Sequence, residues 1–467
     1  MIRPTAAAAN RQAIPDGFTV QLHADVEVGD WLVCGARVIR LSSVARKLLT
    51  DRQLVVSSTA SATLAAKLLD LDLADPVHLT GGPTLSLTVV VPVRDNAAGV
   101  DRLLAGLAGG AACIVVDDAS RDPHELAGVV GRHGAELLRL DRNVGPAAAR
   151  DAGLARVATD LVAFIDSDVQ ITLGSLERLG GYFADPALAA AAPRVRSRNG
   201  VRAFQRYEAA CGSLDLGGTS ATIRPWSRVS YVPSACLVAR VGALGEGFDP
   251  RLRSGEDVDL VWRLLAAGHR VRHVADVEAL HDVRSTPAAW LGRKAFYGTS
   301  AAALAQRHGD LVAPAAVTSA GALVVAGALV QRPWSWAVAG GGLGWMLAQT
   351  RRRLPGLAPR QQLTIVGVTA SELGRQTCGV ALRHWWPLAL LLAVASARSR
   401  RGLVLLAVAD TLAAHRASGT DLDPLRFGLA RRADDLAYGA GLWWGAAQAR
   451  SVRCLLPRLV RTRSARR

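Results

Sequence analysis

Two aspartates directly follow a short apolar run in the middle of the chain. The run Leu161–Ile165 is entirely apolar, and Asp166-Ser167-Asp168 comes next. In an extended segment, residues two apart point to the same side, so the carboxylates of Asp166 and Asp168 can face one ligand. Hard divalent cations prefer oxygen ligands, and they bridge phosphates. The pair therefore predicts a site for Mg²⁺ or Mn²⁺, where the ion would neutralise a departing diphosphate.

Further acidic residues follow two other apolar runs. Asp95 comes shortly after residues 87–91, and Asp117-Asp118 follows residues 113–116. These runs alternate with helix-like segments, which predicts an α/β fold with a doubly wound, mostly parallel sheet. Because such sheets bind ligands at the carboxyl ends of their strands, we expect the acids to lie at one edge. One of the two adjacent aspartates is expected to be a structural turn residue, and Asp118 is the functional candidate.

Five motifs and their order resemble the family 2 glycosyltransferases, which have the GT-A fold. The matching stretches between residues 86 and 281 are SLTVVVPVRDN, CIVVDDASRD, RNVGPAAARDAGL, LVAFIDSDV and SGEDVDLVWRLLAAGHRV. The resemblance implies an enzyme that moves a sugar from a nucleotide diphosphate to a hydroxyl group. Attack opposite the leaving diphosphate would invert the anomeric centre without a covalent enzyme intermediate.

The resemblance also implies roles for individual residues. Asp168 would bind the metal, and His281, after the next strand-like run, is a second candidate ligand. Glu256-Asp257 matches the family's Glu-Asp motif, in which Asp257 would be the base that takes the acceptor's proton. The residues implied at the nucleotide are Pro92, Val93, Asp95, Asp118, Arg150 and Asp166.

Structural explanations of these residues stay open. Asp-x-Asp triplets also occur as solvated turns, and Asp257 could be an acid stabilised at a helix N-terminus. Arg150 is equally well explained as a solvated helix charge, and His281 as a partly buried histidine. For Asp166, Asp168 and Asp257 the companion motifs favour the catalytic interpretation.

One departure from processive members of the family follows the Glu-Asp motif. Those members carry Gln-x-x-Arg-Trp there, whereas this chain has Arg293-Lys294-Ala295-Phe296-Tyr297. Arg293 and Lys294 could bind the donor diphosphate, but a solvated basic helix face is the favoured explanation. A channel-forming polymerase is therefore not favoured.

A small module precedes the catalytic stretch. Residues 18–77 contain short strand-like runs and two helix-like runs, which is typical of a winged-helix-like fold, and Gly81-Gly82-Pro83 predicts a linker. With RKAFYGTSAAAL and the apolar C-terminal part, this arrangement is similar to the glycosyltransferases of mycofactocin systems, whose N-terminal module is PqqD-like.

That resemblance implies specific substrates. The donor would be UDP-glucose, and the acceptor would be premycofactocin, a redox cofactor made from a ribosomal peptide, which would receive a β-linked glucose chain. The PqqD-like module would bind the peptide-derived partner through a strand edge. A purely structural packing role for the module stays open.

The C-terminal third of the chain is apolar and rich in tryptophan. Residues 311–331 and 333–350 contain no charge, and each is close in length to the roughly 20 apolar residues that span a bilayer. Seven of the 11 tryptophans lie beyond Gln331, and Arg-rich stretches follow. This pattern predicts association with an anionic membrane surface on its cytoplasmic face. A soluble helical domain rich in Ala and Gly stays open.

These observations predict three domains: a PqqD-like module at residues 1–82, a GT-A domain at 83–310 and an apolar helical region with a basic tail at 311–467. The net charge of +16 comes mainly from Arg in the apolar region and tail, so we expect no nucleic-acid partner. Six scattered cysteines and a polar N-terminus predict a reducing compartment and no cleaved signal peptide. The alternative functions are transfer to a lipid carrier or cell-wall glycan, and a non-catalytic, membrane-anchored peptide-binding protein.

Overall fold

The computed structural model describes residues 13–77, 86–198 and 200–460. The chain divides into two compact units. The sheet unit comprises residues up to 24, 42–201 and 208–283, and the helical unit comprises residues 25–41, 202–207 and those from 284 onward.

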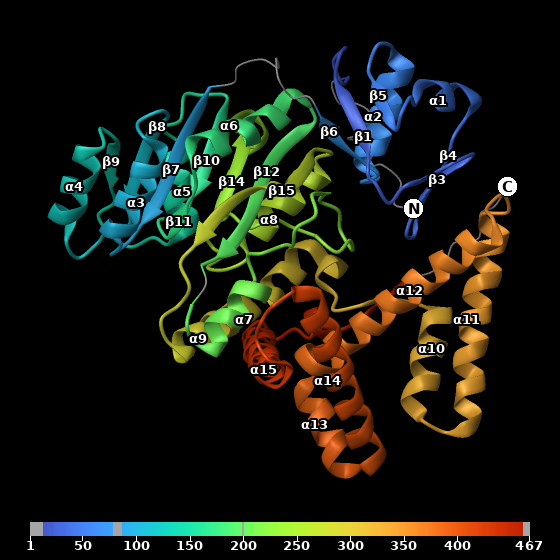
Figure 1. Cartoon of the computed structure of the whole chain (residues 1–467). Coiled ribbons are helices and arrows are strands. Elements are labelled where there is room, and N and C mark those ends of the chain that lie inside the picture. The colour runs from blue at the N-terminus through green and yellow to red at the C-terminus, as the bar shows by residue number, and fades with distance from the viewer. Residues whose placement is uncertain (1–12, 78–85, 199, 461–467) are drawn as a thin grey trace. The chain divides into compact units, whose positions relative to one another are not determined.

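A nine-stranded sheet forms the core of the sheet unit (Figure 1). Its order is β11-β15-β12-β14-β10-β7-β8-β9, and β13 pairs with β15. The strands are β7 (Leu87–Val93), β8 (Ala112–Asp117), β9 (Glu136–Arg139), β10 (Leu161–Ile165), β11 (Val169–Gln170), β12 (Leu188–Ser197), β13 (Ala221–Thr222), β14 (Cys236–Arg240) and β15 (Arg270–His281).

Strands β10, β7, β8 and β9 are parallel, as the alternating pattern predicts. The parallel arrangement is interrupted at β14, which runs antiparallel to both β10 and β12. Strand β11 is likewise antiparallel to β15. The sheet is therefore mixed, which the apolar runs alone do not reveal because parallel and antiparallel central strands are equally apolar.

Helices connect the strands of this sheet: α3 (Ala97–Leu107), α4 (Pro123–Arg132), α5 (Pro146–Leu154), α6 (Leu173–Gly181) and α8 (Glu256–Ala266). Asn96 caps α3 by accepting a hydrogen bond from the Gly99 amide, and Asp122 caps α4 in the same way. Helix α5 packs directly on β7, because a Cβ atom at Gly153 would lie only 2.4 Å from Val90 Cγ1. This close packing fixes the helix that carries Arg150.

The expected N-terminal module contains two small sheets, β5-β1-β6 and β2-β3-β4. Its elements are β1 (Thr19–Leu22), β2 (Glu27–Val28), β3 (Trp31–Cys34), β4 (Arg37–Arg40), α1 (Ser43–Leu48), β5 (Gln53–Val55), α2 (Thr59–Asp70) and β6 (Ala74–Val77). The first sheet belongs to the sheet unit, whereas the second belongs to the helical unit, where Val33 packs against Leu357 and Ile365. The expected linker at residues 81–83 lies outside the described residues.

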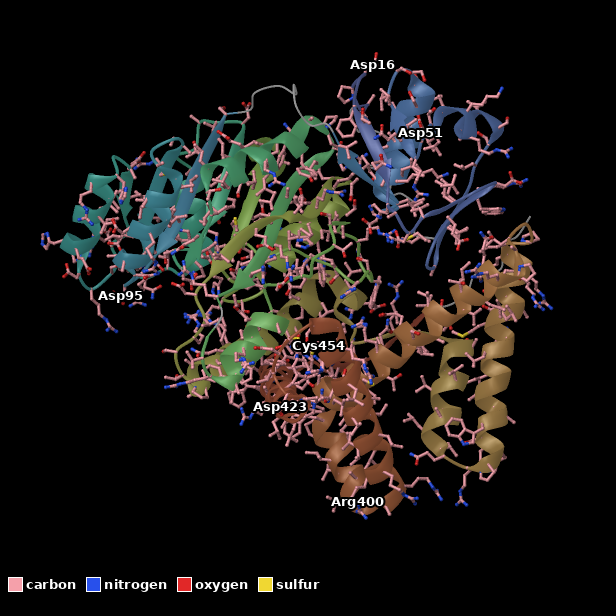
Figure 2. All side chains as sticks on the ribbon, viewed as in Figure 1. Asp16, Asp51, Asp95, Arg400, Asp423 and Cys454 are labelled. Carbon is pink, nitrogen blue, oxygen red and sulfur yellow. The ribbon has the colours of Figure 1, made fainter. Side chains whose placement is uncertain are left out.

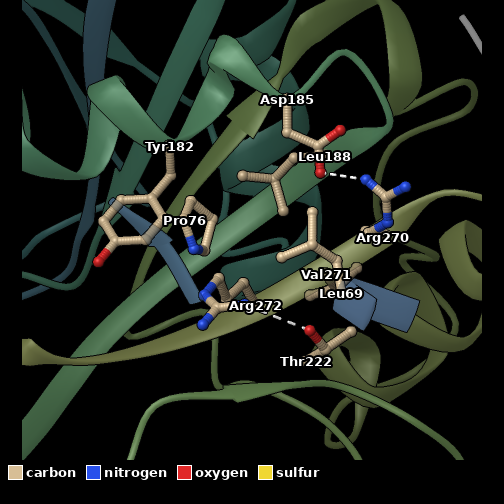
Figure 3. A pocket seen from close by; sticks show the side chains of 9 residues that line it. All are labelled: Leu69, Pro76, Tyr182, Asp185, Leu188, Thr222, Arg270, Val271 and Arg272. Carbon is tan, nitrogen blue, oxygen red and sulfur yellow. Dashed lines mark hydrogen bonds and ion pairs between the residues drawn. The ribbon is translucent and has the colours of Figure 1, made fainter. Parts of the chain in front are cut away.

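Ion pairs join the end of α2 and strand β6 to the start of β15. Arg270 pairs with Asp70 at 2.8 Å, and Arg272 pairs with Asp75. Figure 3 shows the small pocket at this junction, where Arg270 also pairs with Asp185. Strand β15 is therefore held firmly at the end opposite His281.

The helical unit contains α9 (Pro287–His308), α10 (Ser319–Val330), α11 (Pro333–Arg353), α12 (Pro359–Gly379), α13 (Trp386–Ala395), α14 (Ala397–Ser418) and α15 (Pro424–Gln448). One π-helical turn, η5 (Val380–His384), separates α12 from α13, and β16 (Ala316–Thr318) pairs with β17 (Arg458–Val460). Helices α9 and α15 pack closely because α15 has a glycine at the contact. A Cβ atom at Gly441 would be 1.8 Å from the Ala295 carbonyl oxygen of α9.

The two uncharged stretches expected as membrane spans differ in structure: residues 333–350 lie within the single helix α11, whereas residues 311–331 do not form one continuous helix. Residues 311–331 contain β16 and then α10, which has only 12 residues. Among the described residues, no single helix combines the length and apolar character needed to cross a bilayer. The helical stretch Pro359–His384 and α13 meet these criteria only when taken together, and they are bent by 88° relative to each other.

Candidate active site

The loop that carries the two aspartates after β10 is tightly anchored. The side chain of Asn96 donates hydrogen bonds from Nδ2 to the carbonyl oxygen of Ser167 at 3.2 Å and to its hydroxyl at 3.0 Å. Gly99 allows this approach, because a Cβ atom there would lie 2.2 Å from the same carbonyl oxygen. The flanking carboxylates of Asp166 and Asp168 stay partly exposed.

Asp168 and His281 lie together, as the sequence predicts. Asp168 Oδ2 is 3.3 Å from His281 Nε2, and the pairing of β11 with β15 brings the two residues together. Neighbouring ligands of an octahedral ion bound at about 2.1 Å are separated by about 3 Å, so the pair fits two adjacent positions around one ion. Within the described residues, no group of three His, Cys, Asp or Glu side chains could hold a metal ion. A metal bound here would therefore take most of its ligands from substrate and water.

Arg150 is buried between two of the predicted acids. Its Nη2 lies 2.6 Å from Asp166 Oδ1, its Nη1 lies 2.9 Å from Glu256 Oε1, and its guanidinium stacks 5.4 Å from the ring centre of Phe248. Burial disfavours the charge, but the two carboxylates outweigh it and raise the pKa of Arg150 above its ordinary value. The solvated helix charge is therefore wrong as an explanation, since Arg150 links the acids of β10 and α8.

Asp257 is the second residue of α8 and follows Glu256. Its Oδ1 accepts a hydrogen bond from the Val258 amide at 2.8 Å, and its Oδ2 accepts one from the Ser234 amide at 3.3 Å. Burial and then the negative charge of Glu256 raise the pKa of Asp257 to about 7, although the two amides and Arg150 oppose the shift. A carboxylate with this pKa can accept a proton near neutral pH.

Asp117 and Asp118 have separate structural partners. Asp117 is fully buried, where it accepts a hydrogen bond from the Ser120 amide and pairs with Arg139 at 2.7 Å. Asp118 accepts hydrogen bonds from the amides of Val144 at 2.6 Å and Gly145 at 2.9 Å. Asp118 thus shapes the loop before α5, and its contact with a nucleotide stays a prediction.

The residues predicted to cradle the base lie at the carboxyl end of β7. Pro92 and Val93 are buried within the sheet, so their side chains face the core rather than an open site. Asp95 is exposed at the edge of the sheet unit and has a positive φ of 55° (Figure 2). Its carboxylate accepts a hydrogen bond from the Arg121 amide, and its own amide donates one to Ser120.

Arg293 and Lys294 belong to α9 in the helical unit. Lys294 is only 2 % exposed, and its ammonium lies 3.3 Å from Asp434. The prediction of a solvated basic face is therefore wrong for Lys294. Because that ammonium is already paired inside the helical unit, we do not retain Lys294 as a diphosphate ligand. The guanidinium of Arg293 instead stacks near the rings of Phe296 and Tyr297.

Two supporting residues escaped the sequence-based prediction. Asn96 anchors the loop that carries Asp166 and Asp168, and Phe248 stacks on Arg150, yet neither residue type signals such a role. Asn96 stands directly before a helix and next to Asp95, so the sequence indicates only a helix cap.

The fold and the site together define a class of protein. Asp166 and Asp168 lie between β10 and β11, and Asp257, whose pKa is raised, lies in the first turn of α8. This arrangement suits a nucleotide-sugar glycosyltransferase. Residues 88–246 match the family Glycosyl transferase family 2. The chain belongs to this family and is a glycosyltransferase.

A particular branch of the family is also evident. The pre-mycofactocin glycosyltransferases of two Mycobacterium tuberculosis strains are 43% identical to this chain over 96% of its length and 98% of theirs. The chain therefore belongs among the glycosyltransferases of mycofactocin systems.

Similar solved structures are more distant. A mannosyltransferase from Pyrobaculum calidifontis, solved with GDP-Man and Mn²⁺, is 18% identical, covers 64% of this chain and 90% of its own, and has a TM-score of 0.38. TarS of S. aureus, solved with UDP-GlcNAc, is 14% identical, covers 79% and 93%, and has a TM-score of 0.39. At these scores neither structure bears on the function.

Proposed function

We propose that the chain is an inverting, metal-dependent glycosyltransferase that moves glucose from UDP-glucose to premycofactocin and builds a β-linked oligoglucose chain. The proposed identity of the acceptor rests on the similarity, over nearly the whole chain, to relatives named pre-mycofactocin glycosyltransferases. The site geometry supports the chemistry, because it combines a cation-binding pair with a basic carboxylate.

Asp168 and His281 are the residues that would hold the metal. Their spacing of 3.3 Å suits one ion, and both side chains remain partly exposed to a substrate. A divalent cation bound there would neutralise the charge that develops on the departing UDP. Asp166 lies on the same loop, where Arg150 holds its carboxylate, and it would contact the nucleotide.

Asp257 would act on the acceptor. As the acceptor hydroxyl oxygen forms its bond to the anomeric carbon, the bond from that carbon to the diphosphate oxygen breaks, and UDP leaves with the bonding electrons. The hydroxyl proton passes to the Asp257 carboxylate. Attack from the face opposite the diphosphate inverts the anomeric centre, so no enzyme nucleophile is required.

The N-terminal elements would contribute to acceptor recognition. Strand β5 pairs with β1 on one side of its three-stranded sheet. Edge strands offer main-chain donors and acceptors to an extended peptide. We therefore extend the proposal to a PqqD-like role, in which β5 receives the peptide-derived partner.

A second candidate acceptor is a lipid carrier or cell-wall glycan. The observation that favours it is the large number of exposed Leu, Val and Trp side chains in the helical unit. The two proposals share the donor chemistry and differ in the acceptor, and therefore in the product.

The test is a transfer assay with the purified full-length chain. UDP-, GDP- and dTDP-sugars would be offered with and without Mn²⁺, first alone and then with premycofactocin or a polyprenyl phosphate. The proposal expects Mn²⁺-dependent consumption of UDP-glucose and a product heavier by glucose units only with premycofactocin. Transfer to the polyprenyl phosphate alone would favour the second candidate, and binding of no nucleotide sugar would overturn both.

A further inference from the structure

The two helical hairpins of the helical unit are apolar on the outside. The first is formed by α10 and α11, and the second by α13 and α14 (Figure 1). The large apolar side chains exposed on the first hairpin are Leu323, Leu329, Val330, Trp334, Trp336, Leu343 and Trp345. Those exposed on the second are Leu388, Leu390, Leu391, Leu392, Val394, Val404, Leu405, Val408 and Leu412. We call these residues the hairpin surface.

Small residues occupy the inside of the first hairpin instead. A Cβ atom at Gly327 would lie 2.5 Å from the Ser335 carbonyl oxygen, and one at Gly342 would lie 2.8 Å from Val324 Cγ2. The fully buried Ser335 hydroxyl donates a hydrogen bond to the Gly327 carbonyl at 2.7 Å. Close packing through Gly and Ser with Leu and Trp outside is typical of helices packed in lipid, where burying large apolar side chains inside gains little.

The second hairpin likewise has large apolar side chains on its outside. Only Ala393 is buried in α13, whereas Leu391 is 67 % and Val394 84 % exposed. Helix α14 buries none of its residues. In water this arrangement is unfavourable, because each large apolar side chain gains about 1.5–3 kcal/mol on burial. The tips of the two hairpins meet, since Gln331 Nε2 donates a hydrogen bond to the Arg398 carbonyl oxygen at 3.3 Å.

The charge of this part of the chain is strongly positive. Residues 311–409 contain a single acid, Glu372. The same stretch contains ten arginines: Arg332, Arg351, Arg352, Arg353, Arg360, Arg375, Arg383, Arg398, Arg400 and Arg401. Arg400 lies at the end of the second hairpin (Figure 2). A second copy of the chain would bring like charges together, whereas an anionic lipid surface would neutralise them.

One helix of each hairpin is too short to cross a bilayer. At about 1.5 Å per residue, α10 is about 18 Å long and α13 is about 15 Å long, compared with a hydrocarbon core of about 30 Å. Arginines at both tips would lie in the hydrocarbon if the hairpins entered tip first to that depth. Lying along the interface, the hairpins would place Trp334, Trp336 and Trp345 at the headgroup level, which tryptophan favours.

We propose that the hairpin surface docks the enzyme onto an anionic lipid bilayer as an interfacial anchor. The Leu, Val and Trp side chains enter the acyl boundary, and the arginines at the tips contact lipid phosphates. The proposal is independent of the donor and acceptor, because it rests on the helical unit alone.

Vesicle flotation of the purified full-length chain tests this proposal. Vesicles of phosphatidylcholine alone are compared with vesicles of equal parts phosphatidylcholine and phosphatidylglycerol. The wild type is expected to float with the anionic vesicles. The double variant Leu391→Ser/Val394→Ser should partition at least about tenfold less, given the apolar burial lost. Val201→Ser is the matched control, since Val201 is 95 % exposed but belongs to the sheet unit, and it should float like the wild type.

Charge is tested by the triple variant Arg398→Gln/Arg400→Gln/Arg401→Gln, which should lose its preference for phosphatidylglycerol. Extraction of membranes with alkaline carbonate should release the wild type. Retention in the carbonate pellet would overturn the proposal in favour of a spanning segment. A second outcome would also overturn it: the wild type floats with neither kind of vesicle, and light scattering shows an oligomer that the double variant Leu391→Ser/Val394→Ser no longer forms. The hairpin surface would then be an interface between copies of the chain. Circular dichroism of each variant establishes that it is folded.

Discussion

Arg150 Nη1 lies 2.9 Å from Glu256 Oε1, although 106 positions separate the two residues in the chain. The Nη2 atom of Arg150 pairs with Asp166, so one buried cation joins the loop after β10 to the helix that begins with Glu256 and Asp257. Burial alone would disfavour this cation, and the two carboxylates keep it charged.

Replacing Arg150 by Met is expected to lower the free energy of unfolding by about 3–5 kcal/mol, because the buried carboxylate of Glu256 loses its partner. The loss of the nearby positive charge should also raise the pKa of Asp257. Chemical denaturation measures the first effect and the pH–rate profile measures the second. In the double variant Arg150→Met/Glu256→Gln, part of the stability should return, since residue 256 no longer carries an unpaired buried charge. Equal stability of the wild type and Arg150→Met would contradict the buried ion pair.

Asp257→Asn should bind the donor normally but lower kcat by about 10²–10⁴-fold, because a general base contributes this much. A base works only when deprotonated. In the wild type, kcat should therefore fall as the pH drops through about 7, the raised pKa of Asp257. Glu256→Gln removes the neighbouring negative charge, so the acid limb of its profile should move to lower pH. An unchanged limb in Glu256→Gln would mean that another group controls it.

Asp168→Ala should abolish Mn²⁺-dependent binding of UDP-glucose, and His281→Ala should weaken it by about tenfold or more, because each substitution removes one of two adjacent ligands. Isothermal titration calorimetry of UDP-glucose binding, performed once in the presence of Mn²⁺ and once in the presence of EDTA, measures how much of the binding depends on the metal. Asp276→Asn is the matched control, because Asp276 lies on β15 like His281 but pairs with Arg178 on the exposed surface. Metal-independent donor binding by the wild type would contradict these assignments.

Gly441→Ala should destabilise the helical unit by about 1–3 kcal/mol, because its Cβ atom would overlap the Ala295 carbonyl oxygen of α9. Gly340→Ala in α11 is the control, since the space around Gly340 is open and Ala favours the helix by up to about 1 kcal/mol. Thermal unfolding should show a lower Tm for the first variant and an equal or higher Tm for the second. A higher Tm for Gly441→Ala would show that α9 and α15 pack less closely.

The sequence by itself determined the elements whose signal is local. Apolar runs predict β7, β8 and β10, and the acids at the carboxyl ends of these parallel neighbours lie at one edge of the sheet. Asp168 directly precedes β11 and His281 ends β15, so the pairing of these strands brings the two side chains together, and their role as metal ligands stays a prediction.

Only the tertiary structure decided which charges meet. Arg150 and Lys294 both carried a solvated alternative in the sequence, and both are buried in ion pairs with acids more than a hundred positions away. The same holds for β14, whose antiparallel direction depends on its neighbours, and for α10–α14, whose large side chains face outward. The physical reason is that hydrophobic periodicity follows from local backbone geometry, whereas an ion pair or a packed face depends on which distant segment the folded chain brings beside it.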